Sequence, residues 1–217
     1  MGRRLTGRER RESIVASAAR LFSRHGFSGV STRSIAQDAG ISEAMLFKHF
    51  PRKDGLYREI LRRHLANLER ALPLAPLAAS EAPPERLFRE IADGMLRRME
   101  ADPTLLRLTF FSALEGHPMA RDIERARARG LRAALARYLR RQHRGGRLRV
   151  EDPGVAARSF LWLVAGFAFS RTVFGEAGAR AVPRRSLARK LARQFLSGLH
   201  PAARHRQPST RPRRNGR

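Results

Sequence analysis

The chain has 217 residues and contains 45 Lys and Arg against 19 Asp and Glu, a formal net charge of +26 at pH 7. Hydrophobic residues make up 42% of the sequence, enough to form a packed core, so this is not a disordered basic chain. Such an excess of positive charge favours a polyanionic partner, and nucleic acid is the first candidate. Because there are no cysteines, disulfides, cysteine nucleophiles, zinc fingers and iron–sulfur clusters are excluded.

The first helix is expected at about residues 8–24, where apolar residues recur at helical spacing. Gly26 stands where a left-handed C-terminal cap belongs. A second helix is expected over Thr32 to Asp38. A third is expected between Ser42 and Phe50, and it must end there because Pro51 disfavours a helical residue before it.

A fourth helix from about Lys53 carries leucine and isoleucine at helical spacing and stops at Pro73. Residues 73–84 are rich in proline and alanine and form the clearest break in the chain. Two later helices are expected to begin at the Asp-Pro pairs of Asp102 and Asp152, which place an N-cap carboxylate before a first-turn proline. The helices expected beyond the break span residues 85–100, 103–115, 118–143, 153–175 and 183–199. This pattern predicts an all-α fold.

Neither secretion nor membrane insertion is expected. Residues 1–4 have the basic flank of a signal peptide, but the charged residues 9–12 interrupt the apolar region that must follow. The longest apolar run, Phe160 to Phe169, is about half of the roughly 20 residues that a spanning helix needs. We therefore expect a cytoplasmic protein in which this run is a buried core helix.

Residues 32–50 have the spacing of a helix-turn-helix, two short helices joined by a tight turn. Ala36 is small where the second helix must cross the first, and Gly40 can adopt the positive φ that the turn requires. Ser42 is placed to cap the next helix through its hydroxyl. The apolar residues of the segment are expected to share a core with the first helix: Ile35, Ala39, Ile41, Leu46 and Phe50.

A larger set of positions extends this pattern from the first helix to the fourth: Ala18, Leu21, Phe22, Gly26, Phe27, Ser31, Thr32, Ile35, Ala36, Ala39, Gly40, Ile41, Ser42, Leu46, Phe47, His49, Phe50, Lys53 and Leu56. Together they resemble the N-terminal DNA-binding signature of the TetR family of transcriptional regulators. The agreement covers roughly residues 8–57. The rest of the chain resembles the family only in length and helix count.

The resemblance implies a homodimer whose third helices enter successive major grooves of a double-stranded DNA operator. It also implies a C-terminal helical domain that binds a small-molecule effector. The positions that would face base edges are Arg33, Glu43, Ala44, Met45 and Lys48, and those near phosphates are Thr32, Phe47, His49 and Lys53. The free N–H groups of the helix that starts at Ser42 suit a phosphate or a base acceptor.

One position departs from the family, which usually has tyrosine where this chain has Phe47. A phenyl ring donates no hydrogen bond to phosphate, so we expect Phe47 to serve in packing. Other roles stay open from the residues alone. Glu43 either accepts a hydrogen bond from cytosine N4 or complements the helix dipole. Lys48 either contacts DNA or is a solvated surface residue, and the basic residues 3–11 either follow the DNA or form a solvated terminus.

In the C-terminal half, apolar and aromatic residues are expected to line a small-molecule pocket, the alternative being an ordinary core. These candidates are Met95, Met99, Phe110, Phe111, Leu114 and Trp162. The last helix has an apolar stripe wider than one neighbour needs, which with the preceding apolar helix predicts a two-fold dimer surface. The residues assigned to that surface are Phe167, Leu187, Leu191, Phe195 and Leu199.

We therefore expect a helix-turn-helix DNA-binding domain over residues 1–52, an effector-binding and dimerisation domain over 53–199, and a basic disordered tail over 200–217. No metal, cofactor or enzymatic activity is expected, since the histidines form no ligand pair and no catalytic or nucleotide-binding motif is present. The sequence predicts a repressor that a small-molecule effector releases from a palindromic operator. The alternative is a basic nucleic-acid-binding or nucleoid-associated protein without sequence readout.

Overall fold

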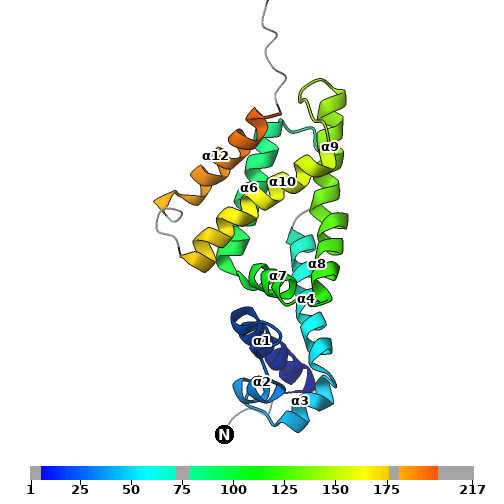
Figure 1. The fold of residues 1–217 in the computed structure, drawn as a ribbon, viewed down its shortest axis with the longest axis vertical. Coiled ribbons are helices and arrows are strands. Elements are labelled where there is room, and N and C mark those ends of the chain that lie inside the picture. Colours follow the sequence, from blue (N-terminus) through cyan, green and yellow to red (C-terminus); the bar gives the residue numbers. More distant parts are fainter. Residues whose placement is uncertain (1–5, 72–78, 176–180, 200–217) are drawn as a thin grey trace, which may run out of the picture.

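The computed structural model describes residues 6–71, 79–175 and 181–199. Over these residues the chain is helical and has no strand, which confirms the predicted all-α fold. Figure 1 shows an elongated molecule with α1, α2 and α3 at one end and α6, α9, α10 and α12 toward the other. The expected basic tail, residues 200–217, lies outside the described residues.

Helix α1, Gly7–His25, begins with two reciprocal cap bonds. The Glu9 amide donates to the Thr6 hydroxyl at 3.2 Å, and the Thr6 amide donates to the Glu9 carboxylate at 2.8 Å. The helix ends at Gly26, whose φ of 74° is positive as expected. Residues 8–11 therefore belong to the first turns of a helix and not to an extended arm.

The helix-turn-helix forms as predicted from α2, Thr32–Asp38, and α3, Glu43–His49. Gly40 has a φ of 65° in the turn between them. The Ser42 hydroxyl caps α3 by accepting from the Met45 amide at 3.2 Å. These local contacts set the angle at which α3 leaves α2.

The core beneath the helix-turn-helix is shared with later parts of the chain. The first half of α4, Lys53–Ala71, supplies Leu56, Tyr57, Ile60 and Leu61, all fully buried. The same cluster includes three residues from α7 and α8, namely Leu108, Met119 and Ile123. The N-terminal core thus includes residues from beyond the expected domain boundary at residue 52.

The second core is formed by α6 Pro84–Ala101, α7 Thr104–Leu114, α9 Ala133–Arg144, α10 Pro153–Phe169 and α12 Arg184–Ser197. Helix α8, Met119–Arg127, contributes its buried residues to the first core. Helix α12 packs along α6, and α10 packs against α6 and α9. Phe88 is the centre of an aromatic group, with ring centroids 4.6 Å from Phe160 and 5.2 Å from Phe195. The N-cap predicted at Asp152 is present, since its carboxylate accepts from the Gly154 and Val155 amides.

The prediction of a single helix over residues 118–143 is wrong. A π-helical turn, Ala128–Arg132, separates α8 from α9, and inside it Gly130 has a non-helical ψ of −119°. Glycine tolerates this conformation because it has no Cβ. A second π-helical turn, Ser170–Phe174, extends α10 and ends at Gly175, which has a φ of 66°. The break at Gly130 opens space between α8 and α10.

Candidate nucleic-acid interface and ligand cavity

Helix α3 lies at one end of the molecule (Figure 1), and its outer face carries exposed side chains. Ser42, Ala44 and Lys48 are exposed, and so is 43% of the Phe47 side chain, whereas Leu46 is buried beneath them. Arg33 is exposed at the start of α2. The helix therefore presents a polar and partly apolar surface whose orientation is fixed by its buried leucine.

The starts of α2 and α3 are tied together by the Thr32 hydroxyl, which donates to the Glu43 carboxylate. Both side chains are half-buried. Beside them, the Met45 sulfur lies 3.8 Å from Nη1 of Arg10 on α1. His49, in the last turn of α3, is also half-buried. Thr32, Glu43 and Met45, which are expected to contact DNA, thus also make contacts that join α1, α2 and α3.

Lys53 has a structural role in the same region. Its ammonium donates to the carbonyl oxygens of Phe27 and Val30, both at 2.9 Å, and lies 4.2 Å from the centroid of the Phe27 ring. These contacts hold the loop that precedes α2. The expected contact between Lys53 and phosphate stays a prediction.

Glu59 of α4 connects three arginines behind the helix-turn-helix. Its carboxylate accepts from Arg62 at 3.0 Å, from Arg63 at 2.7 Å and from Arg11 of α1 at 3.0 Å. The hydrogen bonds, that from Arg62 first, lower the pKa of Glu59 to about 2. Arg11 also lies 4.6 Å from the Phe50 ring centroid, so the cluster joins α1 and α4 to the end of α3.

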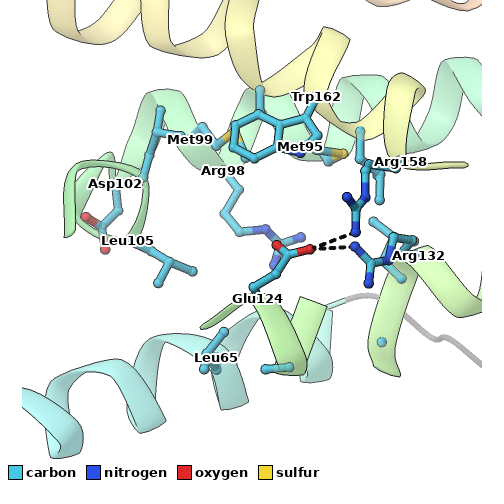
Figure 2. Close-up of a pocket in the computed structure, with 16 residues that line it drawn as sticks. Leu65, Met95, Arg98, Met99, Asp102, Leu105, Glu124, Arg132, Arg158 and Trp162 are labelled. Carbon is cyan, nitrogen blue, oxygen red and sulfur yellow. Dashed lines mark hydrogen bonds and ion pairs between the residues drawn. The ribbon is translucent and has the colours of Figure 1, made fainter. Parts of the chain in front are cut away.

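A cavity of about 130 Å³ lies between α4, α6, α7, α8 and α10 (Figure 2). Three of the predicted pocket residues line it, namely Met95, Met99 and Trp162. Phe110, Phe111 and Leu114 are not among the residues that line this cavity. Leu114 is 83% exposed, and Phe110 packs on Phe169 with ring centroids 4.3 Å apart. The other lining residues are Leu65, Arg98, Asp102, Leu105, Leu106, Glu124, Ala126, Gly130, Leu131, Arg132, Arg158, Leu161 and Ala165.

Charged side chains form one wall of the cavity, and sequence reasoning missed them. Glu124 Oε1 accepts from Arg132 Nη1 at 2.5 Å and from Arg158 Nη2 at 3.4 Å (Figure 2). Asp102 lies 3.7 Å from Nδ1 of His64. These residues come from separate helices, and no spacing in the sequence links them. The lining of the cavity therefore combines apolar side chains with charged ones.

The residues assigned to a dimer surface are divided between core and surface. Leu187 and Leu191 are 5% and 2% exposed because α12 packs along α6, which differs from the expectation that they face a partner. Phe195 and Leu199 are half-buried against the same core. Phe167 on α10 is 39% exposed. Of the five, Phe167 thus presents the most apolar surface.

Helix α10 and its π-helical extension form a 22-residue apolar stretch, Pro153–Phe174. By length and composition alone it is able to cross a membrane, with a mean hydropathy of 1.2. The core helix of a globular protein passes the same test. In the 18-residue window that passes this test, 28% of the residues are buried, and the others are partly or fully exposed.

Helix α7 joins the cavity to the N-terminal helices. Leu105 and Leu106 line the cavity, while the Ser112 hydroxyl lies 2.7 Å from the buried hydroxyl of Tyr57 on α4. Just beyond its end, the Glu115 carboxylate accepts from the Phe27 amide at 3.0 Å. A Cβ at Gly26 would lie 2.2 Å from this carboxylate, so the absence of a side chain there permits the contact.

Within the described ranges no group of three or more His, Cys, Asp or Glu is placed to hold a metal ion. The two candidate sites described here are the outer face of α2 and α3 and the cavity of the C-terminal half.

Comparison with known proteins gives the class to which this chain belongs. Residues 14–60 match the model of the bacterial regulatory proteins of the tetR family. Residues 85–197, more than half of the chain, match the C-terminal domain of AefR-like transcriptional repressors. The chain belongs to the TetR family and is a DNA-binding transcriptional regulator. The names of its family and relatives are those of regulators and not of enzymes.

Individual relatives agree with this assignment. The HTH-type transcriptional repressor Rv1474c of Mycobacterium tuberculosis is 28% identical over 170 residues, 77% of this chain and 84% of the relative. The HTH-type transcriptional regulator BetI of Burkholderia mallei is 30% identical over 71% of this chain and 80% of its own length. The structure of the flavonoid-responsive regulator FrrA has a TM-score of 0.58 and 26% identity, over 91% of this chain and 100% of FrrA.

Proposed function

We propose that this regulator is a cytoplasmic repressor that binds a palindromic operator as a homodimer and is released by a small molecule in the cavity. The observation that carries the proposal is the position of α7. This helix lines the cavity through Leu105 and Leu106, and it enters the N-terminal core through Leu108. A ligand that displaces α7 therefore also moves the helices beneath the DNA-reading face.

The reading face consists of the exposed residues of α2 and α3. Arg33, Ala44 and Lys48 are exposed there and are directed to base edges together with Glu43 and Met45. The residues directed to the phosphates are Thr32, Ser42, Phe47, His49 and Lys53. Because Lys53 donates hydrogen bonds to two carbonyl oxygens, its role is to hold the loop before α2 beside the phosphate and to add positive charge there.

The homodimer forms through the apolar face of α10 and its extension. Phe167 and Phe174 are 39% and 74% exposed, and Val155 at the start of α10 is 60% exposed. Large exposed apolar side chains along one helix are typical of a subunit interface. A second copy of α10 related by a two-fold axis would cover them and set the separation of the two α3 helices.

The operator is identified by selecting duplexes from a random pool with the full chain. We expect two-fold symmetric sequences with half-sites about one helical turn apart, because the symmetry of the dimer is repeated in the DNA. The selected duplex is then competed against random DNA at moderate salt. Retention of the operator supports sequence readout. A stable monomer in sedimentation, or selected duplexes without a palindrome, would contradict the proposal.

Release by a ligand is tested with Met95→Trp, which fills the cavity from α6. Because Met95 is 7% exposed and lines the cavity, the larger side chain should abolish release by compounds that free the wild type from its operator. Operator binding without ligand should be retained. Leu114→Trp is the matched control, since Leu114 is 83% exposed and lies outside the cavity. Release that is the same in both variants would place the effector elsewhere.

A further inference from the structure

We propose that the cavity takes a carboxylate with an apolar body, and that Arg98 binds its carboxylate group. The inference rests on the proposed function only for the statement that this cavity is the effector site. It adds the chemical class of the ligand, which neither the family nor the relatives assign.

The charge balance of the lining favours an anion. Three guanidinium groups, those of Arg98, Arg132 and Arg158, face the carboxylates of Glu124 and Asp102. Glu124 is already shared by Arg132 and Arg158. Asp102 is placed beside His64, whose pKa is lowered by burial, so that the imidazole adds no charge at neutral pH. With three guanidinium groups against two carboxylates, the lining has a net charge of +1.

Among the three guanidinium groups, that of Arg98 is the one without a carboxylate partner. Its Nε is buried and has no hydrogen-bond partner, and no ion pair reaches its guanidinium from the described part of the chain. Burial, followed by the charge of Arg97, lowers the pKa of Arg98. In Figure 2 its side chain extends from α6 into the cavity, while the dashed lines reach Glu124 from Arg132 and Arg158 alone. A buried guanidinium N–H that has lost water without gaining an acceptor favours an anion beside it.

A carboxylate suits this group better than other ligand heads. Its two oxygens match the planar fork of a guanidinium and accept two parallel hydrogen bonds. A single negative charge balances the single unpaired positive charge, whereas a doubly charged phosphate exceeds it. An ammonium group would find Glu124 already occupied by two arginines, and the other carboxylate, that of Asp102, is 53% exposed to water.

The rest of the lining defines the body of the ligand. Besides the charged groups, the lining has aliphatic, thioether and aromatic side chains, among them Met95, Met99, Leu161 and Trp162. Methionine side chains adapt to irregular shapes, so the walls accept either an alkyl chain or an aromatic ring. The expected ligand is therefore an amphipathic monocarboxylate.

The test compares head groups on fixed apolar bodies. Decanoate, decan-1-ol and decylamine form one series, and 4-phenylbutyrate, 4-phenylbutan-1-ol and 4-phenylbutylamine form another. Binding to the full chain is followed by the fluorescence of Trp162, the only tryptophan, at constant salt. In at least one series we expect the carboxylate to bind about tenfold more tightly than the alcohol, because only the carboxylate pairs with the guanidinium.

Two variants assign this preference to Arg98. Arg98→Met keeps an apolar stem of similar length and should reduce carboxylate affinity to that of the alcohol. Arg137→Met removes the same charge from an exposed position on α9 and should leave the preference intact, which controls for attraction to a basic surface. An undiminished preference in Arg98→Met would overturn the assignment.

Other results also overturn the inference. These are an alcohol or amine that binds the wild type as tightly as the carboxylate, and the absence of binding by both carboxylates at millimolar concentration. None of these measurements involves DNA, so such a failure leaves the proposed repressor function standing. Conversely, a carboxylate that binds through Arg98 without changing operator affinity upholds the ligand class and contradicts the effector role.

Discussion

The proposed reading of DNA by exposed side chains of α3 can be tested one residue at a time, beginning with Lys48. Lys48→Ala should weaken operator binding strongly. If Lys48 contacts a guanine, the loss should be about 1–3 kcal/mol and confined to one base position. If it contacts a phosphate, the loss should be the same for every DNA sequence. The slope of log K against log salt concentration should then become shallower by about one. Lys190→Ala, exposed on α12, is the control, and equal losses in both variants would mean that Lys48 is only a solvated surface residue.

The ion pairs of Glu59 predict a dependence of stability on acid. The pKa of Glu59 in the folded chain, about 2, lies below the ordinary value of 4.5 for a glutamate. The carboxylate therefore contributes stability above about pH 4.5, and this contribution is lost as the pH falls from 4.5 toward 2. Because Arg62 is 68% exposed and screened by water, we expect Glu59→Gln to lower the free energy of unfolding by only about 2 kcal/mol at pH 7.

Urea denaturation at several pH values measures this effect. The difference between wild type and Glu59→Gln should shrink as the pH falls through that window. Glu151→Gln is the control, since Glu151 is exposed and no ion pair involves it among the described residues. A Glu59→Gln difference that stays constant down to pH 2 would mean that the loss comes from packing and not from charge.

A buried contact between α4 and α7 ties the N-terminal core to the helix that lines the cavity. Tyr57 and Ser112 are both fully buried, and their hydroxyls lie 2.7 Å apart. Tyr57→Phe removes this hydrogen bond but leaves Ser112 bonded to the Leu108 carbonyl, so it should lower the free energy of unfolding by about 1 kcal/mol. Because the N-terminal core includes Leu108 of α7, unfolding should remain a single transition by circular dichroism and by Trp162 fluorescence. Separate transitions for the two probes would show that the halves fold independently.

Most of the positive charge of the chain lies outside α2 and α3. Residues 200–217 contribute six arginines and no acid. Deleting them should lower the affinity for random DNA and the steepness of its salt dependence, because fewer counterions are released. The preferred operator sequence should not change. Loss of the dimer in sedimentation would mean that this segment takes part in the subunit interface.

The helix-turn-helix was predictable from the sequence because its determinants are local. Gly40 at the turn, Ser42 as the cap and the apolar spacing of Ile35 and Leu46 act within one or two helical turns. Most helix bounds followed in the same way from prolines, glycines and caps. The break at Gly130 was missed because an isolated glycine is tolerated in a helix, and only the packing of α8 and α9 makes it a bend.

The cavity and its charges depended on tertiary packing. Met95 and Trp162 were identifiable as apolar candidates, but Arg98, Glu124 and Arg158 lie on three helices that no sequence spacing connects. In a chain with 45 basic residues, one arginine without a counterion has no signature in the sequence. Likewise, Leu187 and Leu191 belong to an amphipathic stripe whether it faces a partner or its own chain. The structure shows that this stripe is buried against α6 of the same chain. The hydrophobic pattern of a helix shows which face is buried, but only the tertiary structure shows which helix covers that face.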